Sequence, residues 1–212
     1  MQPTIELGKR AMPQMTKAAS SGKTSPRAAD NKSEEKDPYE FYKRVGSPKF
    51  FVAPMVDQSE LPYRMLTRKY GAQICYTPMY HARLFSTQAG YRQNMFKPCA
   101  EDRPLVVQFC ANDPDILLNA AKYVEDHCDA VDINLGCPQG IAKKGNYGSY
   151  LLEKTELITS MVRKLRDNLK VPVTCKIRCL PNQEDTLHLA REIEKAGASL
   201  LTVHGRTREH NK

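Results

Sequence analysis

Residues 130–138, Ala-Val-Asp-Ile-Asn-Leu-Gly-Cys-Pro, are the stretch of sequence that most clearly indicates the fold. Polar and apolar residues alternate along its first part, so Asp132 and Asn134 share one face of an extended strand and apolar residues occupy the other. The glycine and proline that follow predict a turn carrying Cys137. Polar side chains at the C-terminal end of a strand are typical of sites built on parallel sheets.

Short apolar, β-branched runs of this kind recur along the chain from residue 48. The six predicted strands are Phe50–Ala53, Ile74–Thr77, Leu105–Phe109, Ala130–Leu135, Val173–Ile177 and Leu200–Val203. Amphipathic stretches lie between most of them, at 59–70, after the Asp-Pro pair at 113–114, from Thr155, and at 184–196. This alternation predicts a parallel sheet with helical crossovers.

Parallel α/β proteins form either open doubly wound sheets or closed barrels. The Gly-x-Gly-x-x-Gly fingerprint of the first class is absent after strand one, where Pro54-Met55-Val56-Asp57 stands. Polar residues instead mark the ends of several strands: Gln108, Asn134, Lys176, Arg178 and His204. We therefore expect an α/β protein of the TIM (β/α)8 barrel class. At about 30 residues a unit, residues 48–212 hold about six of the eight units, so we expect a barrel truncated after strand six.

The composition describes a globular protein with a basic surface. The chain has 212 residues, of which 41% are apolar and 26% charged, and no apolar run is long enough for a membrane span. Its net charge of +8 favours a polyanionic partner. The seven cysteines include no Cys-x-x-Cys pair and no zinc-finger spacing, so we expect free thiols of a reducing compartment and no metal site.

Residues 1–47 are predicted to be a disordered basic leader. They are rich in Ser, Thr, Lys, Ala and Pro, and residues 1–29 carry five basic side chains and one acidic side chain. An organellar (mitochondrial) targeting role is the alternative. The thiols favour the cytoplasm or the nucleus.

Lys176 and Arg178 share a face of their strand with Thr174, whereas Cys175 and Ile177 should meet the helices. Buried cations need a partner, which is either a ligand or a carboxylate such as that of Asp132.

Cys137, in the turn after its strand, should face the site. Its thiol could donate a proton, or act as a nucleophile if it were ionised.

The segment 140–149 is predicted to be a mobile loop. Its glycines and its polar and aromatic side chains suit a lid over a nucleic acid, although an ordinary solvated loop is the alternative; they include Lys143, Lys144, Asn146 and Tyr147. His204, at a strand end, suits a hydrogen bond to a cofactor or a proton transfer, with a purely structural role as the alternative.

Five segments in order resemble the tRNA-dihydrouridine synthases: Ala-Pro-Met-Val at 53–56, Gln-Phe-Cys-Ala-Asn at 108–112, Asp-Ile-Asn-Leu-Gly-Cys-Pro-Gln at 132–139, Cys-Lys-Ile-Arg at 175–178 and Thr-Val-His-Gly-Arg at 202–206. The likeness covers about residues 49–210. It is most similar to the eukaryotic branch that modifies uridines 16 and 17, through segments 56–61, 75–79 and 108–114.

The resemblance implies an FMN-dependent enzyme that reduces uridine to 5,6-dihydrouridine in the D-loop of tRNA, using NADPH or NADH. It implies that Cys137 is the proton donor and that the flavin contacts Pro54, Met55, Val56, Gln108, Asn134, Lys176 and His204. The uridine and nearby phosphates would contact Arg178, Lys143, Lys144, Asn146 and Tyr147. The partner would be tRNA and the protein a monomer. Family members continue into strands seven and eight and an RNA-binding domain, so we expect this chain alone to bind FMN poorly.

Three other functions fit parts of the pattern. One is a different FMN barrel oxidoreductase acting on free pyrimidines, and another is an aldolase that forms a Schiff base on Lys176. The third is a fragment that only binds RNA or is inactive, for which the basic charge would suffice.

Overall fold

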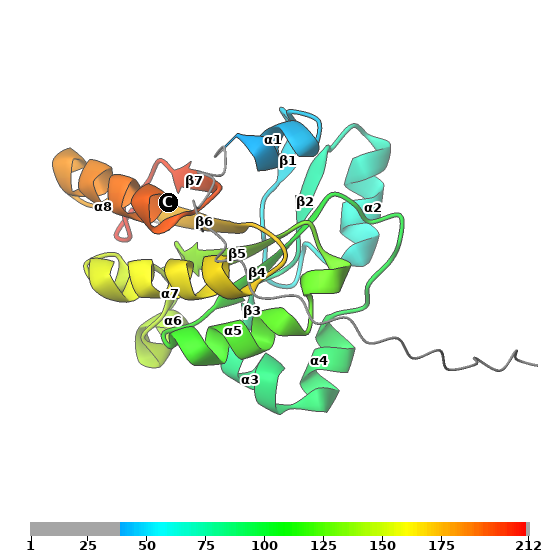
Figure 1. Cartoon of the computed structure of the whole chain (residues 1–212), viewed down its shortest axis with the longest axis horizontal. Helices are drawn as coiled ribbons and strands as arrows, with labels where there is room; N and C mark the ends of the chain where they lie inside the picture. Colours follow the sequence, from blue (N-terminus) through cyan, green and yellow to red (C-terminus); the bar gives the residue numbers. More distant parts are fainter. Residues whose placement is uncertain (1–38, 211–212) are drawn as a thin grey trace, which may run out of the picture. The chain divides into compact units, whose positions relative to one another are not determined.

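The computed structural model describes residues 39–210, which contain a parallel sheet and its connecting helices (Figure 1). The strands are β1 (Phe51–Val52), β2 (Ile74–Tyr76), β3 (Tyr80–His81), β4 (Leu105–Cys110), β5 (Ala130–Leu135), β6 (Val173–Arg178) and β7 (Leu200–His204). The α-helices are α1 (Glu40–Arg44), α2 (Leu61–Lys69), α3 (Ala82–Thr87), α4 (Ala89–Met95), α5 (Pro114–Lys122), α6 (Gly140–Gly145), α7 (Thr155–Asn168) and α8 (Gln183–Ala196). Two 3-10 helices, η1 (Glu125–His127) and η2 (Gly148–Leu151), complete the described elements.

Every strand pair is parallel, and the strands lie in the order β1-β2-β4-β5-β6-β7, with β3 paired to β4. The sheet curls as a partial TIM barrel, which confirms the predicted fold class. All six predicted strands are present. The short strand β3 was not predicted, because two residues give no periodic pattern.

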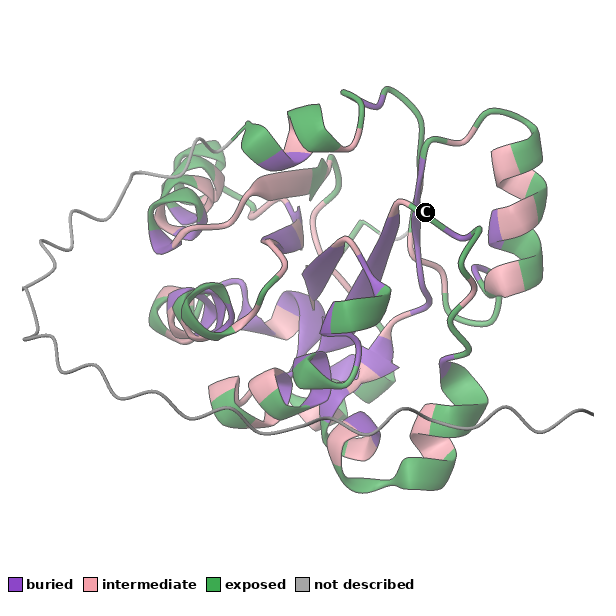
Figure 2. Ribbon diagram, turned by 45° about the vertical axis from the view of Figure 1, so that its right-hand side comes forward, coloured by how far each residue is buried: buried purple, intermediate pink, exposed green. Residues whose placement is uncertain are grey.

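The main core lies between the sheet and the helices on its outer face (Figures 1 and 2). Strand residues of the outer face, among them Val107, Ile133, Cys175 and Ile177, are fully buried and form one cluster with apolar residues of α3, α5, α7 and α8. The prediction that Cys175 and Ile177 meet the helices is confirmed. The opposite face, here called the inner face, is left to carry the polar strand-end residues.

Local sequence signals set the helix ends. Asp113 caps α5, since its carboxylate accepts hydrogen bonds from the backbone N–H groups of Asp115 and Ile116, and Pro114 occupies the first turn. Gly197 ends α8 with a φ of +102°, a conformation that glycine adopts without strain.

The inner face has a small apolar cluster of its own near the N-terminal ends of the strands, made by Phe41, Ile74, Tyr76, Val106 and Ala130. Phe41 belongs to α1, so the disorder expected for residues 1–47 does not extend to residues 40–44, where an aromatic side chain finds a buried position. Residues 1–38 of the expected leader lie outside the described residues.

Candidate active site

The predicted strand-end residues occupy the inner face. The pairing register sets them in three rows across the sheet: Gln108–Asp132–Thr174, Asn134–Lys176–Thr202 and Arg178–His204. Residues from four strands, β4 to β7, are thus neighbours on the inner face although they are distant in sequence. The rows lead toward the C-terminal ends of the strands, as expected for a parallel barrel.

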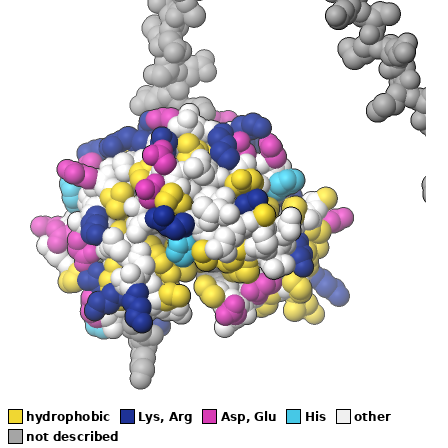
Figure 3. Space-filling view, turned by 90° about the horizontal axis from the view of Figure 1, so that it is seen from below, with side chains coloured by type: hydrophobic (Ala, Val, Ile, Leu, Met, Phe, Trp, Pro, Cys, Tyr) yellow, Lys and Arg dark blue, Asp and Glu magenta, His cyan; other side chains and the backbone are white. Residues whose placement is uncertain are grey.

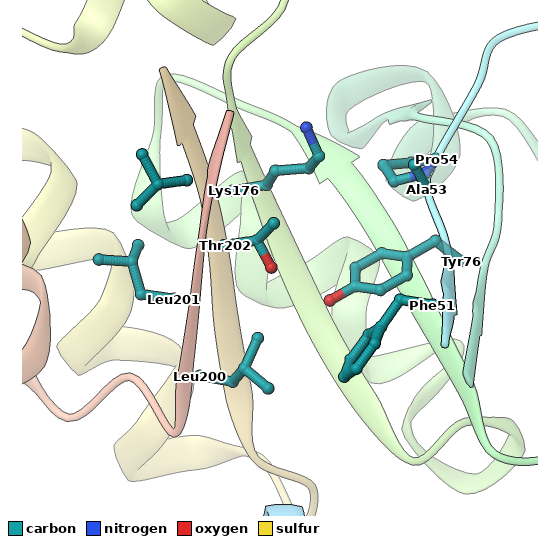
Figure 4. Close-up of a pocket in the computed structure, with 9 residues that line it drawn as sticks. Phe51, Ala53, Pro54, Tyr76, Lys176, Leu200, Leu201 and Thr202 are labelled. Atoms are coloured by element: carbon teal, nitrogen blue, oxygen red, sulfur yellow. The ribbon is translucent and has the colours of Figure 1, made fainter. Parts of the chain in front are cut away.

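A cavity of about 500 Å³ opens on this face between the two ends of the curled sheet (Figure 4). Its volume lies in the range of small-molecule and cofactor sites. Its walls are mainly apolar, with one ammonium and two hydroxyl groups, and its lining consists of Phe51, Ala53, Pro54, Tyr76, Lys176, Leu200, Leu201, Thr202 and Val203.

Lys176 extends into this cavity toward Ala53 and Pro54, and the Tyr76 hydroxyl points toward Thr202 (Figure 4). Burial lowers the pKa of Lys176 and the Arg178 charge lowers it further, while the Asp132 carboxylate raises it. Burial is also the largest cause of the raised pKa of Tyr76. The cavity therefore offers an apolar slot with a half-buried cation at one side.

Pro54, Met55 and Val56 follow β1 after one residue, Ala53. Pro54 lines the cavity, whereas Val56 is exposed. The Ser59 hydroxyl holds the Met55 backbone, with contacts of 2.9 Å to its nitrogen and 3.0 Å to its oxygen. This segment is thus a fixed backbone wall, although Met55 and Val56 are not among the cavity-lining residues.

Gln108 and Asn134 lie beside the cavity instead of lining it. Gln108 is fully buried, and its side-chain amide bonds to Asp132 and to Asn134. Asn134 is half-buried and accepts hydrogen bonds from the turn that carries Cys137.

Cys137 is half-buried in the turn after β5. Its carbonyl oxygen accepts hydrogen bonds from the N–H and the hydroxyl of Ser149, each at 3.0 Å. Its side chain packs at the border of a cluster of Met79, Cys110, Ala142, Tyr147 and Tyr150. The turn is therefore anchored to η2, and the thiol has a defined place at the strand ends.

Arg178 is almost fully buried, and its guanidinium donates to the carbonyl oxygens of Gly136 at 2.8 Å, Thr207 at 2.9 Å and His210 at 3.4 Å. These contacts tie the Cys137 turn to the segment after β7. His204 lies next to Arg178 in the sheet, and burial, together with the nearby cations, lowers its pKa. A neutral imidazole is therefore favoured there.

The prediction of a mobile loop over 140–149 is wrong. The segment forms α6 and η2, and Tyr147 is only 5% exposed. Tyr147 is buried in the cluster with Cys110 and Ala142, and its ring also meets the His81 ring edge-on, with centroids 5.5 Å apart. Lys143, Lys144 and Asn146 remain exposed on the outside of this segment.

Sequence reasoning missed two aromatic residues of the region. Tyr76 shares a strand face with buried Ile74, and this alternation could have placed it on the inner face. His81 lies on β3, and its Nδ1 is buried with no hydrogen-bond partner among residues 39–210. No local pattern marked it.

The seven cysteines are free thiols. Within the described part of the chain, no group of three or more His, Cys, Asp or Glu side chains is placed to hold a metal ion. No helix in that part is long and apolar enough to span a membrane.

Several curated proteins are similar to this chain. It is 56% identical over 172 residues to a tRNA-dihydrouridine(16/17) synthase [NAD(P)(+)] of Schizosaccharomyces pombe, covering 80% of this chain and 43% of that protein. It is 57% identical over 173 residues to the protein of the same name in Saccharomyces cerevisiae, covering 80% and 41%. A human tRNA-dihydrouridine(20a/20b) synthase [NAD(P)+]-like protein is 40% identical over 178 residues, covering 82% and 56%.

The chain thus spans about two fifths of the length of the first two relatives. The model of the dihydrouridine synthase family matches residues 51–212, from β1 to the end of the chain. This range includes the curled parallel sheet, its cavity and the Cys137 turn, so the chain belongs to the dihydrouridine synthase family.

Proposed function

We propose that this protein reduces uridine to 5,6-dihydrouridine in tRNA, with FMN as the cofactor and NADPH or NADH as the reductant. The observation that carries the proposal is the strand register that pairs Asn134, three residues before Cys137, with Lys176, which extends into the cavity. The family membership and the names of the relatives support it.

The cavity fits the ring system of a flavin. It has apolar walls for a flat aromatic group, backbone from Ala53 and Pro54, and the ammonium of Lys176 at its side. A cation is the expected neighbour of a ring that gains negative charge on reduction. Pro54 and Lys176 would hold the ring directly, with Met55, Val56, Gln108, Asn134 and His204 around it.

When bound, FMN would supply the hydride that it accepts from NADPH or NADH. Reduction of the C5–C6 bond of uracil needs one hydride and one proton, and the Cys137 thiol would provide the proton at C5. Arg178 would act by holding the Cys137 turn, through its bond to the Gly136 carbonyl oxygen. Exposed Lys143, Lys144 and Asn146 lie on the adjoining α6 segment and would meet tRNA phosphates.

The net charge of +8 fits a tRNA substrate. On the face shown in Figure 3, Lys and Arg side chains are interspersed with Asp and Glu and do not form one patch. We propose uridines 16 and 17 of the D-loop as the target positions, on the strength of the relatives' names.

The test separates the two half-reactions in the purified protein supplied with excess FMN, because the chain alone is expected to bind FMN poorly. Cys137→Ala should slow the oxidation of reduced flavin by unmodified tRNA by about 10²–10⁴-fold, while reduction of the flavin by NADPH stays within about twofold of wild type. Cys99→Ala is the control, because Cys99 is a half-buried thiol bonded to Glu101 outside the site. The proposal is wrong if tRNA oxidises the flavin equally fast in both variants, or if no dihydrouridine forms.

A further inference from the structure

A continuous row of hydrogen bonds crosses the inner face from a buried carboxylate to the Cys137 turn. Gln108 Nε2 donates to Asp132 Oδ2 at 2.8 Å, and Asn134 Nδ2 donates to Gln108 Oε1 at 2.8 Å. Asn134 Oδ1 then accepts from the backbone N–H groups of Gly136 at 3.1 Å and Cys137 at 2.9 Å. We call Asp132, Gln108 and Asn134 the amide relay.

The direction of the relay follows from its first member. An ionised carboxylate only accepts, so Gln108 must turn its NH₂ group toward Asp132 and its carbonyl oxygen toward Asn134. Asn134 must then donate to Gln108, which leaves its own carbonyl oxygen for the turn. Each amide can satisfy both neighbours in only one of its two orientations.

Burying the Asp132 carboxylate costs free energy of folding. It is fully buried, and burial raises its pKa to about 6, against the opposing effects of Thr174, Gln108 and Lys176. The structure has no ion pair between Asp132 and Lys176, and the carboxylate instead accepts from Thr174 Oγ1 at 2.6 Å and from Gln108. An apolar or amide residue here would avoid the cost of burying a charge.

We propose that Asp132 is a positioning residue for Cys137, because its carboxylate orients the amide relay that holds the Gly136–Cys137 turn. The structural part of the proposal stands on the hydrogen bonds alone. Its consequence for catalysis rests on the proposed function, in which Cys137 donates a proton to the uracil.

The relay predicts which hydrogen bonds are lost when the carboxylate at position 132 and the amide at position 134 are exchanged, singly or together. In Asp132→Asn the side chain can offer Gln108 either its carbonyl oxygen or its NH₂ group, so the relay is no longer held in one direction. In the reversed arrangement Asn134 presents an NH₂ group to the turn, where two donors would meet. In Asn134→Asp two carboxylates flank Gln108, whose carbonyl oxygen faces one of them. The double variant Asp132→Asn/Asn134→Asp restores matched donors and acceptors, with the relay running in the opposite direction.

Amide hydrogen exchange at Gly136 and Cys137, followed by nitrogen-15 NMR, measures the relay without any cofactor or substrate. Asp132→Asn should accelerate exchange at both amides by about tenfold, and the double variant should return it to within about threefold of wild type. Thr174→Val is the matched control, since it removes the other bond to Asp132 and leaves the relay intact; exchange should change by less than about twofold.

The proposal fails if Asp132→Asn leaves both amides protected, if Thr174→Val accelerates them equally, or if the double variant does not recover protection. Should Asp132→Asn not fold, Asn134→Asp compared with the double variant tests the same coupling. A separate outcome concerns the proposed function. If the exchange pattern is as predicted but Asp132→Asn oxidises reduced flavin with tRNA at the wild-type rate, then the relay holds the turn without affecting catalysis, whereas a failure of the proposed function would appear in Cys137→Ala.

Discussion

A buried carboxylate between two arginines should contribute strongly to the stability of the fold. Asp102 is fully buried and pairs with Arg64 at 2.8 Å and with Arg68 at 3.0 Å, and the two arginine side chains are only 3% and 12% exposed. Asp102→Asn keeps the shape of the side chain but removes its charge. Two cations are then left in a region with little access to water.

Breaking a buried ion pair from one side costs about 3–5 kcal/mol. The lower end applies here, because Arg64 keeps its bond to the Ser59 carbonyl oxygen at 2.6 Å and Arg68 keeps its bond to the Pro104 carbonyl oxygen at 2.7 Å. We therefore expect a loss of about 3 kcal/mol of unfolding free energy. With a urea dependence of about 2 kcal/mol per molar, the unfolding midpoint should fall by about 1.5 M.

The assay is urea unfolding of the wild-type chain and of each variant, followed by circular dichroism at one pH. Asp126→Asn is the control, because Asp126 pairs with Lys170 on the surface and both side chains are 68% exposed. Its midpoint should not move measurably. Equal midpoints for Asp102→Asn and wild type would refute the reasoning, since they would mean that the charge of Asp102 does not stabilise the two buried arginines.

Three further predictions concern the site and its supports. Gly148 has a φ of +64°, and a Cβ there would lie 2.7 Å from the Cys137 carbonyl oxygen, so Gly148→Ala should lower the urea midpoint and change the alkylation rate of Cys137. Gly71→Ala is the control for that variant: with φ +97° and open space around it, it should lower the midpoint but leave the alkylation rate of Cys137 unchanged. Asp113→Ala should cost about 1 kcal/mol of unfolding free energy by uncapping α5, measured by urea unfolding. Finally, because the pKa of Asp132 is raised from 3.8 to about 6, the wild-type chain should gain about 2 kcal/mol of stability relative to Asp132→Asn as pH falls from 7 to 4. The measurement is the difference between their urea curves at each pH.

The sign of the last prediction follows from the direction of the shift. The folded state binds the Asp132 proton more tightly than the unfolded state, so protonation stabilises the fold, and this stability is lost as pH rises through about 6. The groups that face this carboxyl are Gln108, Thr174, Lys176 and Tyr76. If the stability difference did not change with pH, the folded structure would not raise the pKa of Asp132, and the prediction would be wrong.

The sequence by itself determined the class of fold and the face on which each strand residue lies. Alternation with a period of two is a local property, so Lys176 and Cys175 could be assigned to opposite faces without knowing which strands are neighbours. Asp113 followed by proline likewise marked a helix start, because capping involves only adjacent residues.

Only the tertiary structure decided which side chains meet. The register pairs Gln108 with Asp132 and Asp132 with Thr174, across 24 and 42 residues of sequence, and this sets the direction of the amide relay. The burial of Tyr147 depends in the same way on residues distant in sequence, among them Cys110 and His81. Such contacts cannot be predicted from local sequence, because a hydrogen bond or ring contact depends on the distance between two side chains in space. The periodicity along one strand gives no information about that distance.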